Sequence, residues 1–171
     1  IQLDSSKYAL WNQVIILDSE LKDYPALSKE SKTTMDLFPN QPLPYLLIGM
    51  ADIVTHKDSS ALSILQEGVV YAFDNKDMTA QFYSNIGDEA FKLKQYKTCF
   101  DAFDRSLAAD STNGFVLNNY SYYLSLQGKN LSKAEEMAKR ANQLDSTNSS
   151  FQDTYAWIFY KAGDFTNAKK W

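Results

Sequence analysis

Hydrophobic residues recur along this chain at the three- and four-residue spacing of amphipathic helices, and short polar segments interrupt them. Tyr83, Ile86 and Ala90 follow one helical face, and after a polar break Cys99 and Phe103 follow another. Side chains three and four residues apart lie on the same side of an α-helix, so this stretch predicts two consecutive helices with a turn between them.

A four-residue sequence occurs twice, unchanged. Asp110–Asn113 is repeated as Asp145–Asn148, and the two copies start 35 residues apart. A fixed period of this size is typical of stacked helical repeats. Each copy supplies short oxygen-bearing side chains that compete for backbone hydrogen bonds, so we expect it to stop one helix and cap the next.

The register around Gly87 extends to nearly the whole chain. An aromatic residue at Tyr83, the aliphatic–glycine pair Ile86–Gly87, the small Ala90 and the aromatic Phe103 stand at the spacing of a helix–turn–helix unit. This pattern resembles the tetratricopeptide repeat, a unit of about 34 residues. The resemblance implies an all-α fold, a right-handed superhelical solenoid of antiparallel helix pairs. One solenoid over residues 1–171 would contain units at 7–41, 42–79, 80–113, 114–148 and 149–171, the last incomplete.

Two local signals predict where helices begin. Ser132 and Glu135 form a capping box, so we expect a helix to start at that point. Pro42 and Pro44 fit only at a helix start or in the loop before it, because proline lacks a backbone N–H.

The register breaks off inside a unit at the C-terminal end. Tetratricopeptide arrays usually close with a solvating helix, because each unit buries an apolar face against the next. We therefore expect a fragment of a longer repeat array, whose exposed C-terminal end is available for self-association.

Composition narrows the classes of partner. The net charge is −4 and no cluster of lysine and arginine forms a basic stripe, which argues against a nucleic-acid partner. The longest apolar runs are far shorter than the ~20 residues of a membrane-spanning helix, so we expect no membrane insertion by this segment.

The side chains needed for catalysis are scarce. His56, the single histidine, falls in a predicted turn, and Cys99, the single cysteine, stands where tightly packed repeat helices need a small side chain. We interpret them as a solvated turn residue and a buried, inert thiol. One histidine and one cysteine cannot supply a zinc site of ordinary ligand spacing, and the scattered glycines form no phosphate-binding loop. The sequence predicts no enzyme, no metal and no cofactor.

Partner binding is the function that the resemblance implies. In tetratricopeptide proteins the first helix of each unit lines the concave face. The positions that usually point into this groove are here mostly uncharged polar or aromatic, a composition that suits an extended peptide. The predicted partner-binding residues are Asn12, Gln13, Leu46, Met50, Gln81, Asn85, Asp88, Asn118, Asn119, Tyr122, Asp153 and Trp157. None is lysine or arginine, so a carboxylate clamp of the co-chaperone type is not expected.

Two functions follow from this surface. The first is a protein–protein interaction scaffold that binds a peptide or a partner domain on the concave face. The alternative is an architectural spacer or assembly module of a larger multidomain protein, its groove filled by its own flanking segments and residues such as Leu46 covered by neighbouring parts of the protein. The phrases Leu117–Tyr120 and Asp153–Trp157 resemble bacterial tetratricopeptide proteins, many of which work at the cell envelope, so an envelope location is favoured over the cytoplasm.

Overall fold

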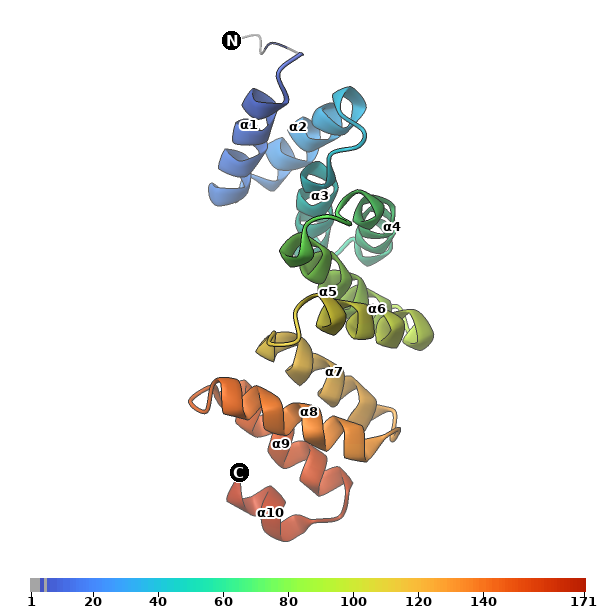
Figure 1. The fold of residues 1–171 in the computed structure, drawn as a ribbon, viewed down its shortest axis with the longest axis vertical. Coiled ribbons are helices and arrows are strands. Elements are labelled where there is room, and N and C mark those ends of the chain that lie inside the picture. The colour runs from blue at the N-terminus through green and yellow to red at the C-terminus, as the bar shows by residue number, and fades with distance from the viewer. Residues whose placement is uncertain (1–3, 5) are drawn as a thin grey trace. The chain divides into compact units, whose positions relative to one another are not determined.

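The computed structural model describes residue 4 and residues 6–171, and in this part of the chain it contains helices and no strand (Figure 1). Short turns join most consecutive helices. The α-helices are α1 (Tyr8–Glu20), α2 (Tyr24–Leu37), α3 (Pro42–Val54), α4 (Asp58–Gly68), α5 (Lys76–Lys92), α6 (Tyr96–Ala109), α7 (Gly114–Leu126), α8 (Leu131–Leu144), α9 (Ser149–Lys161) and α10 (Phe165–Lys170), and a short 3-10 helix, η1 (Val69–Tyr71), follows α4.

The chain divides into two compact units, residues 1–102 and residues 103–171, with the boundary inside α6. In unit 1, α1 packs on α2 and α3 on α4; in unit 2, α7 packs on α8 and α9 on α10. The helix α5 begins at Lys76, ahead of residue 80, where the sequence register starts the third repeat. Asn75 sets this earlier start, because its side chain caps α5 by accepting a hydrogen bond from the backbone N–H of Met78.

The core of unit 1 forms where α1, α2 and α3 meet. Ile15, Leu27, Leu47 and Ala51 are buried there, and the partly buried Met50 packs against them. Tyr24 and Leu43 complete the cluster. The apolar side of α3 is therefore largely covered from within unit 1.

Gly49 allows α3 and α4 to approach closely. A methyl group placed on Gly49 would lie 2.5 Å from Cδ2 of Leu65, a side chain of α4 that is fully buried. No carbon pair tolerates that separation, so the glycine lets Leu65 fill the space beside the α3 backbone.

Small residues have the same role in unit 2. Ala134, Ala138 and Ala141 of α8 are fully buried, as the sequence register predicts for packing positions of a second helix. They recur at the spacing of one helical face. These small side chains allow α8 to pack closely against α7 and α9.

The two copies of Asp-Ser-Thr-Asn adopt the same structure. Asp110 accepts hydrogen bonds from the backbone N–H and the hydroxyl of Thr112, at 2.9 and 2.8 Å. Asp145 does the same with Thr147, at 3.0 and 2.8 Å. The asparagine that ends each copy caps α7 or α9 by accepting a backbone N–H of the first turn. The prediction that these segments stop one helix and start the next is confirmed.

The predicted start of α8 is confirmed to within one residue, but the predicted capping box is wrong. The helix begins at Leu131, and its N-cap residue is Asn130, which adopts a left-handed conformation with φ 47° and makes no side-chain capping hydrogen bond. Ser132 therefore lies inside the first turn, past the position from which it could act as the N-cap. The proline prediction is confirmed, since α3 starts at Pro42.

Candidate partner-binding site

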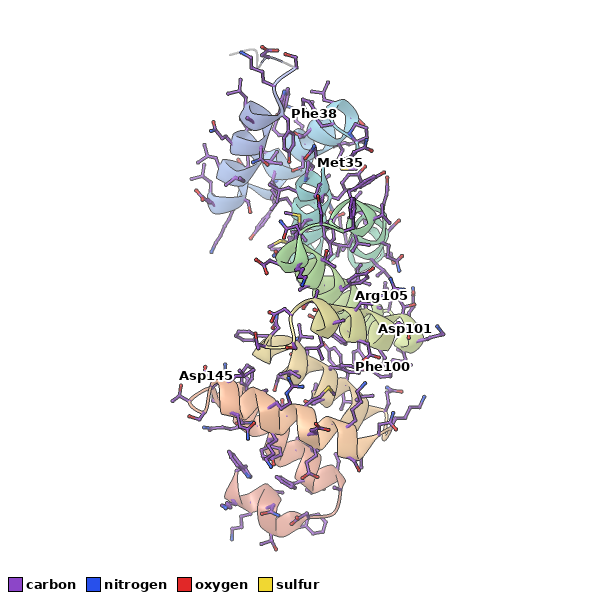
Figure 2. All side chains as sticks on the ribbon, in the orientation of Figure 1. Met35, Phe38, Phe100, Asp101, Arg105 and Asp145 are labelled. Carbon is purple, nitrogen blue, oxygen red and sulfur yellow. The ribbon has the colours of Figure 1, made fainter. Side chains whose placement is uncertain are left out.

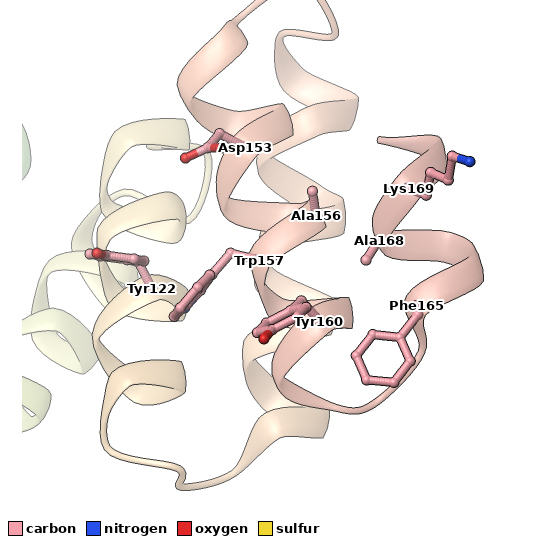
Figure 3. Close-up of a pocket in the computed structure, with 8 residues that line it drawn as sticks. All are labelled: Tyr122, Asp153, Ala156, Trp157, Tyr160, Phe165, Ala168 and Lys169. Atoms are coloured by element: carbon pink, nitrogen blue, oxygen red, sulfur yellow. The ribbon is translucent and has the colours of Figure 1, made fainter.

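A pocket opens on unit 2 between α7, α9 and α10 (Figure 3). Its volume is about 460 Å³. Its walls are Tyr122, Asp153, Ala156, Trp157, Tyr160, Phe165, Ala168 and Lys169. Three of these, Tyr122, Asp153 and Trp157, were predicted from the sequence, and we call the whole set the α7/α9 pocket.

The repeat geometry explains why these side chains meet. Tyr122 and Trp157 stand one repeat period apart, so α7 and α9 present them at equivalent positions. Because α7 packs against α9, the two side chains reach the same pocket, as Figure 3 shows. Asp153 lies one turn before Trp157 on α9 and completes this side of the wall.

Aromatic rings form most of the apolar surface of the pocket. Trp157 and Tyr160 stack with centroids 5.7 Å apart, and Tyr160 meets Phe165 edge-on at 5.6 Å. Such contacts fix ring orientation and add stability beyond the buried area. The wall is therefore already ordered before any ligand enters.

The indole N–H of Trp157 is a buried polar group of the wall that has no hydrogen-bond partner among the described residues. Its nitrogen is buried, and no acceptor among the described residues bonds it. A buried donor without an acceptor costs free energy, and a ligand carbonyl recovers it if the indole shifts to expose the nitrogen. Lys161 lies with its ammonium 5.6 Å from the centroid of the indole ring. Asp153 and Lys169 supply the two charges of the pocket wall.

Asn118 and Asn119 bond to each other next to this region on α7. The Nδ2 of Asn118 donates to Oδ1 of Asn119 at 3.3 Å, and Asn118 is only 8% exposed. The Oδ1 of Asn118 is buried and accepts no hydrogen bond from the described residues. The structure thus places this pair outside the pocket wall.

Other predicted residues lie on the first helices of unit 1. The amide of Gln81 on α5 donates to the sulfur of Met50 on α3 at 3.7 Å, so these two predicted residues meet. Asn12 accepts a hydrogen bond from the hydroxyl of Tyr8 at 3.2 Å. Leu46 is 2% exposed and packs in the core, which leaves no side chain surface for a partner.

The remaining predicted residues of unit 1 lie on α1 and α5. Gln13 is exposed, while Asn85 and Asp88 are half-buried on α5. The Nδ2 of Asn85 is buried and bonds no described acceptor. Asp88 is close enough to Cys99 to act on its thiol electrostatically.

Sequence reasoning missed the contribution of α10. It drew the site from the first helices alone, whereas Phe165, Ala168 and Lys169 close the pocket from the following second helix. Phe165 follows Asp164, which caps α10 by accepting from the N–H of Asn167. An aromatic residue directly after a capping aspartate is the sequence signal that could have identified it.

The two residues considered for catalysis lie apart from the pocket. His56 is an exposed turn residue between α3 and α4 with φ 58°, and Cys99 is fully buried. Burial, followed by the negative charge of Asp88, raises the pKa of the Cys99 thiol to about 12. Both interpretations from the sequence are confirmed.

Searches for metal sites and membrane spans were negative for the residues that the structure describes. No group of three or more histidine, cysteine, aspartate or glutamate side chains there is placed to hold a metal ion. None of the helices combines the length and the apolar character needed to cross a bilayer.

Comparison with known proteins identifies relatives by structure only. No protein-family model matches the sequence, and no curated protein matches it. MamA from Desulfovibrio magneticus RS-1 superposes with a TM-score of 0.83 at 15% identity, over 99% of this chain and 92% of that chain. YrrB, described as a TPR protein with an unusual peptide-binding site, gives 0.77 at 13% identity, over 91% and 78%. The Cut9–Hcn1 hetero-tetramer of APC/C gives 0.77 at 15%, over 89% and 30%.

Proposed function

We propose that this chain, which has the tetratricopeptide-repeat fold, is a non-enzymatic scaffold that holds a peptide segment of a partner protein in the α7/α9 pocket. The observation that carries the proposal is the open aromatic pocket whose wall contains a buried indole N–H without an acceptor. Adjacent repeats supply Tyr122 and Trp157 from equivalent positions, so the pocket arises from the repeat itself.

The chemistry of the pocket fits a peptide. A volume of about 460 Å³ falls in the range of about 300–1,000 Å³ typical of ligand pockets. Aromatic walls bind apolar side chains with little loss of conformational entropy, and the indole of Trp157 can donate to a backbone carbonyl. YrrB, a structural neighbour, is described as having a peptide-binding site, which supports the same class of ligand here.

First-helix residues of unit 1 are proposed separately, as polar contacts for a partner protein on that unit. Asn12, Gln13 and Gln81 carry amides that can both donate to and accept from a peptide backbone. Leu46 is left out of the proposed contacts because it is buried. Its burial favours the alternative function at this position, in which neighbouring parts of the protein cover Leu46.

A peptide library tests the proposal. Random peptides displayed on phage are selected on the folded protein, and the dissociation constants of the winners are measured for the wild type, Tyr122→Ala and Trp157→Ala. Phe73→Ala is the matched control, because Phe73 is an aromatic side chain, 83% exposed, in the other unit. We expect at least about tenfold weaker binding for both pocket variants and no change for the control. Equal affinity for all four proteins would overturn the site.

Partner class and compartment complete the proposal. The net charge of −4 favours a protein over a nucleic acid as the partner.

Self-association through the C-terminal end is a further proposal. Sedimentation over a range of protein concentrations detects it, and a constant monomer mass contradicts it. The likeness of the repeat phrases to bacterial envelope proteins supports an envelope location, and fractionation of source cells with recovery in the cytosol alone would contradict that.

A further inference from the structure

A second groove lies in unit 1 between the second helices α2 and α4, with α3 as its floor. Two adjoining pockets form it, with volumes of about 410 and 340 Å³, and both are lined by Ser28, Lys32, Asp52 and Lys57. No residue that the sequence predicted for partner binding lines either pocket. We call it the α2/α4 groove.

The groove lies on the other side of α3 from the predicted partner-binding residues. Ile48, Asp52 and Thr55 face it and recur at spacings of four and three, so they share one side of the helix. Leu46 and Met50 are also one turn apart, and at 3.6 residues per turn they fall on the roughly opposite side. A ligand of this groove therefore contacts α3 on a face that the first proposal does not use.

Positive charge gathers in the groove although the chain is acidic. Lys29, Lys32 and Lys57 line it, and Asp52 is the acidic residue among its walls, whereas the whole chain has a net charge of −4. Like charges brought together at a groove concentrate an electrostatic field there, which attracts an oppositely charged partner. The overall composition of the chain, which is acidic, does not account for this local group of lysines.

The single carboxylate of the groove is already satisfied. Asp52 is 5% exposed, and its two oxygens accept from Nζ of Lys57 at 3.3 Å and from the hydroxyl of Ser60 at 2.5 Å. Lys29 pairs with Glu30 at 3.0 Å on the exposed surface, a contact worth about 0–1 kcal/mol. Lys32 is exposed and forms no ion pair with a described residue. Among the described lysines of the groove, Lys32 is therefore unpaired and Lys29 is paired only at the exposed surface, so these two ammonium groups can bind a ligand carboxylate.

Apolar side chains line the same groove. Met35 on α2, labelled in Figure 2, Ile48 on α3 and Ile64 on α4 are half-buried around the smaller pocket. Tyr24 and Pro25 add apolar surface to the larger one. An inorganic anion or a nucleic-acid phosphate would leave this apolar surface unused, whereas a peptide with apolar and acidic side chains uses both.

We propose that the α2/α4 groove is a docking site for an acidic segment of a partner protein. Apolar side chains of that segment contact Met35, Ile48 and Ile64, and its carboxylates accept from the ammonium groups of Lys32 and Lys29 at the rim. Charge-assisted bonds of this kind at an interface rim speed association and weaken with added salt. This site is independent of the α7/α9 pocket.

Three peptide arrays test the docking site. The first holds peptides of leucine, phenylalanine, aspartate and glutamate; the second replaces the acids by their amides; the third replaces the apolar residues by serine. Binding to the folded, labelled protein is read at low and at high salt. The proposal expects the first array alone to bind, and to lose binding at high salt. Equal binding to the second or third array would overturn it, as would no binding to the first.

Charge reversal locates the site. The variant Lys29→Glu/Lys32→Glu should bind peptides of the first array at least about tenfold more weakly. Lys76→Glu/Lys97→Glu makes the same change of charge at exposed residues outside the groove and should bind with unchanged affinity. Equal losses in both variants would assign the effect to net charge and overturn the groove. Trp157→Ala should leave this binding intact, so failure here and failure of the α7/α9 pocket are told apart.

Discussion

Trp157 stacks on Tyr160 along α9, with ring centroids 5.7 Å apart and planes inclined by 26°. The two residues are three apart in sequence, so one helical face presents both rings. Phe165 meets Tyr160 edge-on, which extends the ordered wall into α10. The α7/α9 pocket is thus held in shape by its own aromatic contacts, and a ligand need not order it.

Truncation of Trp157 should cost most of the peptide affinity. Trp157→Ala removes both the ring and the N–H, so we expect a loss of at least about 2 kcal/mol of binding free energy, typical of an interface hot spot. Trp157→Phe keeps a smaller aromatic ring and removes the donor together with part of the apolar contact area, so a loss of at least about 1 kcal/mol is expected. Calorimetric titration with a selected peptide measures both. Unchanged affinity for Trp157→Phe would mean that the N–H does not contribute to binding, whereas identical losses for the two variants would mean that the retained phenyl ring contributes nothing.

The contact between Gly49 and Leu65 should limit the stability of unit 1. Gly49→Ala forces a methyl group against Leu65, and overpacking of this kind costs about 1–3 kcal/mol. Leu65→Ala leaves a cavity and costs about 2–5 kcal/mol. Urea denaturation measures the free energy of unfolding of each variant.

The double variant distinguishes this clash from other effects of the substitution. Gly49→Ala/Leu65→Ala places the new methyl group beside the space that Leu65 vacated, so its loss should fall clearly below the sum of the two single losses. Simple additivity would show that the two residues do not interact as described.

Cys99 should be inert at neutral pH and stabilise the fold up to alkaline pH. Its pKa is about 12 in the folded chain, raised from 9.0 by burial and then by Asp88, so the native state holds the thiol proton more tightly than the unfolded state. The contribution of the protonated thiol to the free energy of unfolding is fully present below pH 9.0 and is lost as the pH rises toward about 12. Thiolate absorbance on titration, and labelling by a disulfide reagent with and without urea, check it. Rapid labelling of the folded protein at neutral pH would contradict the account.

The ring of Tyr120 should matter more than its hydroxyl. The ring stacks on Phe103 at 5.3 Å and is 2% exposed, whereas the hydroxyl bonds Asp104 at 3.1 Å and Lys133 at 2.9 Å near the surface. We expect Tyr120→Ala to cost about 3–5 kcal/mol and Tyr120→Phe about 1 kcal/mol. Thermal or urea unfolding measures the difference. Similar losses for both would place the stability in the hydroxyl network instead.

Local sequence signals predicted the fold because their partners are close in sequence. The Asp110 and Asp145 segments end and start helices through bonds to residues two or three positions away, which any reader of the sequence can locate. The capping box at Ser132 failed because the preceding Asn130 adopts a left-handed conformation that starts the helix earlier.

The candidate site was predicted only in part, because it depends on packing between helices. Tyr122 and Trp157 were predicted because the repeat register assigns them to equivalent positions in adjacent repeats. Leu46 was misjudged, since its burial depends on the helices that pack on α3, which the pattern of α3 itself does not show. Lys169 was missed because the register assigns second helices to packing, whereas α10 turns part of its surface to the pocket.

The indole N–H resonance of Trp157 tests the central claim most directly. The chain has three tryptophans, so a nitrogen–proton correlation spectrum holds three indole signals, and Trp157→Phe identifies the relevant one. Titration with a selected peptide should move this signal downfield as the N–H gains an acceptor, and leave that of Trp11, in unit 1, in place. A Trp157 signal that stays unmoved at saturation would contradict peptide binding in the α7/α9 pocket.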